Sequence, residues 1–249
     1  MSKRVSYSWA DPWLTLPLKG LYPRLGIPAW LPPEAIVACG HVAALGGAVG
    51  LALATRWWWA GWIAAAGVAL NHVCDVLDGT HARATGQCRN GGELLDHFVD
   101  PLSFSYWSAG MAAAATADER LAPWAPWLGL AGVVVIYAMA VLTNIRAKMV
   151  GEFTLARFGP TEFKSLLVLL GVALAVVMGG GDARWAPVVA GGVLSALVVT
   201  GAGQLVAGLV RSVGEVNALG AAAADTTEWV LRAEAPASGG RGAPASVDR

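Results

Sequence analysis

Two short stretches determine what kind of protein this chain is: DVLDGTHAR at residues 75–83 and, eight residues later, GELLDHFVD at residues 92–100. They place four aspartates, Asp75, Asp78, Asp96 and Asp100, in largely apolar surroundings. The first pair has i,i+3 spacing and the second has i,i+4 spacing, so each pair lies on one face of an α-helix. If these two helices face each other, the four carboxylates form one cluster.

Such a cluster requires compensation, because an aspartate in the middle of a bilayer costs about 2.5–3.5 kcal/mol even on a lenient insertion scale. Four neighbouring carboxylates also repel one another unless protons or cations intervene. Oxygen ligands without histidine or cysteine favour Mg²⁺ or Mn²⁺. The pattern therefore predicts a site for two divalent ions. Two alternatives use the same acids: they cap helix ends at the cytoplasmic interface, or they line a path for protons or cations.

The segments around this stretch predict an all-α, polytopic membrane protein. A helix needs about 20 mostly apolar residues to span a bilayer. Six windows of the sequence meet that requirement, at residues 35–55, 57–78, 94–116, 124–144, 163–179 and 185–209. The aspartates lie at the end of the second window and at the beginning of the third.

Composition and charge agree with this topology. The chain is 56% hydrophobic and 14% charged, which is too apolar for an ordinary soluble domain. Its net charge is zero, which gives no basic surface for nucleic acid. When the six windows alternate sides, fourteen of the seventeen lysines and arginines fall on one side. Basic residues are retained in the cytoplasm, so both termini and the aspartates are expected to face it.

We expect three parts along the chain. Residues 1–34 mix Trp, Leu and Tyr with basic residues, which is typical of a segment lying in the headgroup plane. Residues 35–215 form the six-helix domain. Residues 216–249 are rich in Ala, Gly, Pro and Ser and are expected to form a flexible cytoplasmic tail.

The spacing of the two stretches resembles, position for position, the signature of the CDP-alcohol phosphatidyltransferase family. The eight matching residues are Asp75, Asp78, Gly79, Ala82, Arg83, Gly92, Asp96 and Asp100. The resemblance implies a phospholipid-synthesis transferase, often a homodimer, that moves a phosphoalcohol from a CDP-alcohol to a hydroxyl acceptor and releases CMP. Asp75, Asp78 and Asp96 would hold two Mg²⁺ or Mn²⁺ ions, and Asp100 would complete the shell and deprotonate the acceptor. Gly79, Ala82, Arg83 and Gly92 would contact the CDP group.

Two further runs bear on the substrate. The run at residues 92–97 and the GPTE run at 159–162 resemble choline and ethanolamine phosphotransferases, which implies a CDP-choline or CDP-ethanolamine donor and a diacylglycerol acceptor. Glu93, His97 and Glu162 would then lie near the headgroup.

The run at residues 144–148 instead resembles relatives that use inositol phosphate, in which Arg146 and Lys148 would bind the acceptor phosphate and CDP-diacylglycerol would be the donor. Cytoplasmic topology alone also explains these two basic residues. A cation or proton transporter is the less favoured alternative, because a transport path has little use for Arg83 beside paired aspartates.

Overall fold

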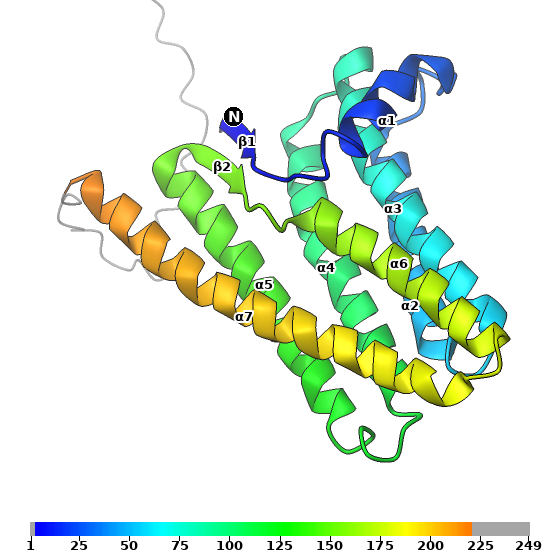
Figure 1. The fold of residues 1–249 in the computed structure, drawn as a ribbon. Helices are drawn as coiled ribbons and strands as arrows, with labels where there is room; N and C mark the ends of the chain where they lie inside the picture. Colours follow the sequence, from blue (N-terminus) through cyan, green and yellow to red (C-terminus); the bar gives the residue numbers. More distant parts are fainter. Residues whose placement is uncertain (1–2, 221–249) are drawn as a thin grey trace, which may run out of the picture.

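A computed structural model describes residues 3–220 of the chain (Figure 1). Six long helices make up most of this part. They are α2 (Pro33–Leu53), α3 (Trp58–Thr85), α4 (Asn90–Ala115), α5 (Ala125–Val150), α6 (Pro160–Gly179) and α7 (Ala186–Ala218). Shorter elements are β1 (Lys3–Ser6), α1 (Thr15–Leu21), β2 (Glu152–Leu155) and 3-10 turns at Tyr22–Arg24 and Ala183–Trp185. The expected tail lies mostly outside the described residues.

The prediction of an all-α membrane protein is confirmed. Five of the long helices, all except α4, are long and apolar enough to cross a bilayer. The α4 helix falls short because aspartates and serines lie among its apolar residues, including Ser103, Ser105 and Ser108. Several helices continue past the expected spans, and α3 ends only at Thr85, where Gly86 adopts a left-handed conformation with φ of 73°. This extra turn carries Ala82 and Arg83 on the same helix as Asp75.

Helix α3 approaches both α2 and α6 closely because glycine and alanine line these two contacts. A Cβ on Gly61 of α3 would come within 2.5 Å of the Gly171 carbonyl oxygen of α6. A Cβ on Gly50 of α2 would come within 2.5 Å of the Ala64 backbone nitrogen of α3. Small residues allow this approach in a membrane, where van der Waals packing drives helix association. Trp107 of α4 closes the core, and its indole nitrogen donates a hydrogen bond to the Ala44 carbonyl at 3.0 Å.

Helices α5 and α7 lie on the outside of this group. In Figure 1, α7 crosses in front of α5 and reaches the end of α4. Only 11% of the most apolar window of α5 and 6% of that of α7 is buried. Their outward side chains are mainly valine and leucine, among them Val134, Val141, Val199 and Val206. These faces suit contact with lipid.

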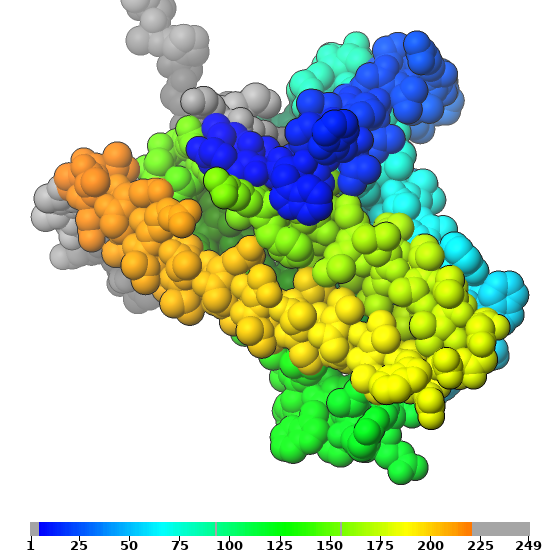
Figure 2. Space-filling view, viewed as in Figure 1, coloured from blue at the N-terminus to red at the C-terminus, as the bar shows by residue number. Residues whose placement is uncertain are grey.

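The N-terminal segment is tied to the start of α6, which the sequence pattern did not predict. Strand β1 pairs in parallel with β2, with Lys3 opposite Glu152. Farther along, Ser8 donates a hydrogen bond from its hydroxyl to Glu162 at 2.6 Å, and the Ala10 N–H donates to the same carboxylate at 3.0 Å. In Figure 2 the N-terminal residues, in blue, lie over the beginning of α6. We call residues 3–11 the N-terminal strap.

Asp11 fastens the other side of the strap. Its carboxylate accepts hydrogen bonds from the hydroxyls of Ser6, Thr15 and Thr161, the last at 2.6 Å. Partial burial raises the pKa of Asp11, but these hydroxyl donors and Lys19 outweigh burial and lower the pKa below 3.8 overall. Trp9, Trp13 and Trp30 remain exposed, so the membrane-interface prediction for residues 1–34 stays open to test.

Candidate active site

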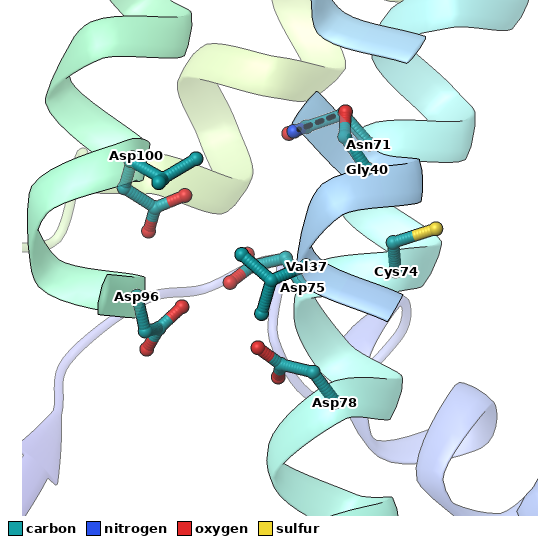
Figure 3. Close-up of a pocket in the computed structure, with 9 residues that line it drawn as sticks. Val37, Gly40, Asn71, Cys74, Asp75, Asp78, Asp96 and Asp100 are labelled. Atoms are coloured by element: carbon teal, nitrogen blue, oxygen red, sulfur yellow. Dashed lines mark hydrogen bonds between the residues drawn. The ribbon is translucent and has the colours of Figure 1, made fainter. Parts of the chain in front are cut away.

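A small pocket lies between α3 and α4, at the end of the bundle where the N-terminal strap also lies (Figures 1 and 3). Four aspartates from the two stretches line it, together with Val37 and Gly40 of α2, Asn71 and Cys74 of α3, and Val99 of α4. In Figure 3 the carboxylates of Asp75 and Asp78 point from one helix toward those of Asp96 and Asp100 on the other. The expected carboxylate cluster is therefore present.

Within the cluster, Asp75, Asp96 and Asp100 are closest together. One ligand oxygen from each of them lies within 4.8 Å of the others. Asp78 lines the same pocket, but it lies outside this closest group. Its carboxylate accepts a hydrogen bond from the N–H of Gly79, the next residue along the helix. Three of the four predicted ligands thus form a compact oxygen set, and the fourth lies at its edge.

Lys164 of α6 is the site residue that the sequence pattern missed. Its ammonium nitrogen lies 2.6 Å from Asp75 Oδ2 and 3.6 Å from Asp100 Oδ1. The side chain is only 2% exposed, and the ammonium lies over the ring of Phe104, 5.6 Å from its centroid. Close packing of α6 against α3 brings the lysine to the cluster. In the sequence, Lys164 lies near the start of an apolar helix. A lysine at that position looks like an ordinary basic residue flanking a membrane span on the cytoplasmic side, so the pattern did not mark it as a site residue.

The residues expected to bind the CDP group occupy the last turns of α3. A Cβ on Gly79 would lie 3.3 Å from Nη1 of Arg83. The Arg83 guanidinium therefore lies over the backbone of Gly79, the residue that follows Asp78. Ala82 is half-buried and Arg83 is exposed. Gly92 is not at a tight helix contact, because a Cβ there would meet only Glu34 Oε1, at 3.9 Å. Gly92 therefore does not mark a close approach of two helices.

Among the described side chains, those expected near a headgroup or acceptor do not line the pocket. His97 lies beside α5, where its ring nitrogen Nδ1 is 3.1 Å from Asn144 Oδ1. The side chain of Glu93 lies outside what the structure describes. Glu162 is 2% exposed, and its two oxygens accept hydrogen bonds from Ser8, Ala10 and the Gly159 N–H. These contacts fix the N-terminal strap to the start of α6. They occupy both carboxylate oxygens of Glu162, so the geometry does not favour the expected contact of Glu162 with a headgroup.

The basic residues at the end of α5 also have structural partners. Nε of Arg146 donates to Glu215 of α7 at 2.7 Å, and its Nη1 donates to the Thr154 hydroxyl of β2 at 3.0 Å. Arg146 therefore joins three elements, and its side chain is largely engaged. Lys148 is exposed. The proposed grip on an acceptor phosphate is not favoured for Arg146.

Chemically, the pocket fits a hard divalent cation. Every carboxylate in the closest group offers oxygen, and no histidine or cysteine belongs to that group among residues 3–220. Oxygen-only donor sets suit Mg²⁺ or Mn²⁺ rather than zinc. Bound ions would supply Lewis-acid stabilisation of a phosphoryl group. Arg83 does not line the pocket, but its exposed guanidinium lies beside Gly79, the residue after Asp78, and can bind phosphate oxygens in a two-pronged contact.

Comparison with known proteins gives consistent matches. The model of the CDP-alcohol phosphatidyltransferase family matches residues 33–202. Human cholinephosphotransferase 1 is 26% identical over 168 residues, which cover 64% of this chain and 39% of that protein. The Bos taurus cholinephosphotransferase 1 is 27% identical over 131 residues, covering 51% of this chain and 30% of the relative. The chain thus spans well under half the length of the curated relatives that it matches.

Proposed function

The chain belongs to the CDP-alcohol phosphatidyltransferase family, and we propose on this basis that it is a membrane transferase of phospholipid synthesis. It transfers a phosphoalcohol from a CDP-alcohol to a hydroxyl acceptor and releases CMP. The observation that carries this proposal is the approach of ligand oxygens of Asp75, Asp96 and Asp100 within 4.8 Å of one another, in a pocket that Asp78 also lines.

In this proposal the chain's own residues divide the work. Asp75, Asp78 and Asp96 would hold two Mg²⁺ or Mn²⁺ ions, which would stabilise charge on the diphosphate. Asp100 completes the oxygen set and accepts the proton of the attacking hydroxyl. Arg83 binds the diphosphate, while Gly79 and Ala82 leave room beside it, with Gly92 at the start of α4. The hydroxyl oxygen bonds to phosphorus as the bond from phosphorus to the CMP oxygen breaks.

For the substrate, we propose a CDP-choline or CDP-ethanolamine donor and a diacylglycerol-like acceptor. The curated relatives carry cholinephosphotransferase in their names, and the partners of Arg146 leave little of it free for an acceptor phosphate. Glu93 and His97, on the same helix as Asp96 and Asp100, stay candidates for contact with the headgroup. The alternative is a CDP-diacylglycerol donor with inositol phosphate or another polar alcohol, with Lys148 near the acceptor.

The same proposal covers orientation and assembly. The excess of lysine and arginine on one side of the bundle supports cytoplasmic termini and a cytoplasmic site. A homodimer is proposed from the family resemblance. Residue-specific labelling of single cysteines in intact and opened membrane vesicles tests the orientation. The mass of the solubilised protein, after the mass of the bound detergent is subtracted, tests the dimer.

The deciding experiment measures CMP release by the purified protein in lipid nanodiscs with excess Mg²⁺. CDP-choline, CDP-ethanolamine and CDP-diacylglycerol are supplied in turn, each with diacylglycerol or inositol phosphate. We expect CMP and a new phospholipid only with an aminoalcohol donor and diacylglycerol, and no release by the Asp75→Asn variant. Release with CDP-diacylglycerol and inositol phosphate alone would move the protein to the alternative. No release with any pair, from protein that is folded and loaded with Mg²⁺, would refute the proposed activity.

A further inference from the structure

One cation is already built into the carboxylate cluster. The Lys164 ammonium lies 2.6 Å from Asp75 Oδ2 and 3.6 Å from Asp100 Oδ1, and both aspartates belong to the closest oxygen set. The lysine comes from α6, whereas the aspartates come from α3 and α4. Three helices therefore meet at one ion-pair network.

The surroundings of Lys164 keep this network in place. The side chain is 2% exposed, so water cannot replace the carboxylates as partners of the ammonium. The Phe104 ring lies on its other side, with the ammonium 5.6 Å from the ring centroid, which favours a cation. The buried ammonium offsets part of the repulsion among the four aspartates when no metal ion is bound.

The same ammonium competes with a divalent ion for the cluster. It contacts two of the three carboxylates that would supply the ion's ligands, so any bound ion lies close to a positive charge. Repulsion between a dication and an ammonium a few ångströms apart is large at the effective dielectric of a protein. Lys164 could also favour ion binding by holding a carboxylate in place beforehand, but this saves only the conformational entropy of a short side chain. Repulsion is therefore the larger effect.

We propose that Lys164 is an internal counter-cation: it holds Asp75 and Asp100 together in the ion-free protein and lowers the affinity of the cluster for divalent cations. This inference rests on the proposed use of metal ions. Ion binding then shifts the ammonium away from Asp75 Oδ2 while Asp100 and Phe104 stay within its reach. Lys164 acts through the aspartates and is a positioning residue.

The test is a Mn²⁺ titration by calorimetry on full-length protein in nanodiscs, without nucleotide. The Lys164→Met variant is expected to bind Mn²⁺ at least tenfold more tightly than the wild type. The Lys164→Arg variant keeps the charge and is expected to stay nearer the wild-type affinity. Lys19→Met, which removes an exposed lysine on α1, is the matched control and should match the wild type within twofold.

An unchanged or weaker Mn²⁺ affinity in Lys164→Met would overturn the inference and leave the proposed function intact. Absence of Mn²⁺ binding by the wild type would instead refute the metal site itself, and the inference with it. These two failures are distinguishable because the wild-type titration needs no turnover.

A second measurement covers the case in which Lys164→Met folds poorly. The double variant Asp75→Asn/Lys164→Met loses one charge of each sign. In excess chelator, its melting temperature is expected to exceed that of Lys164→Met alone. The reason is that the introduced asparagine is neutral, so only three carboxylates repel one another in the absence of the lysine. A melting temperature at or below that of Lys164→Met would overturn the counter-cation role.

Discussion

Helices α3 and α7 are both long and apolar enough to cross a membrane, but they have opposite relations to the rest of the protein. Half of the most apolar window of α3 is buried, compared with 6% of that of α7. In α3 the contact residues are glycine and alanine, and the neighbouring backbones lie where a Cβ would have to be. In α7 several glycines, including Gly192 and Gly203, have open space around them. Suitability as a membrane span therefore does not reveal which helix supports chemistry.

The difference separates a close-packed frame from a lipid-facing layer. The frame of α2, α3 and α6 fixes Asp75, Asp78 and Lys164 relative to one another. Helix α4 lies between the frame and the outer pair, and it brings Asp96 and Asp100 to the same pocket. We expect changes in the frame to reach the site, and changes in the outer layer to affect it little.

The largest effect is expected for Asp100→Asn. The amide keeps the shape but cannot accept the proton of the acceptor hydroxyl, so turnover should fall by about 10²–10⁴-fold. Nucleotide binding should survive, because Arg83 and the other aspartates remain. CMP release and binding of labelled CDP-alcohol measure the two properties separately.

Asp118→Asn is the matched control for that change. Asp118 lies at the other end of α4, where Arg120 donates hydrogen bonds that lower the pKa of Asp118 to about 2. It is remote from the pocket, so the same substitution there should leave turnover within twofold. Turnover of Asp100→Asn within a few-fold of the wild type would rule out Asp100 as the base.

A pair of glycine variants tests the packing difference directly. Gly61→Ala in α3 would place a Cβ within 2.5 Å of the Gly171 carbonyl oxygen, and we expect a loss of about 1–3 kcal/mol. Gly203→Ala in α7 meets nothing within 4 Å and should be neutral or stabilising by up to about 1 kcal/mol. Unfolding in mixed detergent and denaturant compares the two free energies. Equal losses at both positions would remove the distinction between frame and outer layer.

Arg146→Gln sharpens the description of the outer layer. The substitution removes the ion pair with Glu215 and the bond to Thr154, which should cost about 1.5 kcal/mol of stability. Because this side chain is engaged in joining α5, β2 and α7, the KM values for donor and acceptor should stay within threefold of the wild type. A tenfold rise in the acceptor KM, without loss of stability, would favour an acceptor that carries a phosphate.

The smallest effect concerns the N-terminal strap and pH. The pKa of Asp11 is lowered below 3.8 in the folded protein, so its stabilising effect is present above that value and is lost as the pH falls through the folded pKa. At pH 7 we expect Asp11→Asn to cost about 1 kcal/mol. The difference between variant and wild type should shrink below about pH 4, as melting curves at pH 3 and pH 7 can measure. A constant difference would mean that the charge of Asp11 is irrelevant.

Local patterns in the sequence were enough to predict the helices and the four aspartates. Apolar windows predict membrane spans, and i,i+3 or i,i+4 spacing predicts which residues share a helix face. Both predictions need only a short stretch of sequence. The position of Lys164 did not follow, because its role depends on how closely α6 packs against α3. The structural partners of Arg146 and Glu162 were not predicted for a related reason: these partners, Glu215 and Ser8, are remote in sequence. The pairing of β1 with β2 leaves no periodic signal in four-residue strands.

The N-terminal strap has a consequence for the order in which the protein is made. Ser8 and its partner Glu162 are 154 positions apart in the chain. At roughly 5–20 residues per second of synthesis, the strap waits about 8–30 s for that partner. During this time α2 to α5 can insert, whereas α6 has not yet been made. Closing so long a loop is slow compared with forming a helix. The N-terminus, the first part to be made, is therefore among the last to find its place, because it cannot be fixed before the start of α6 has been made.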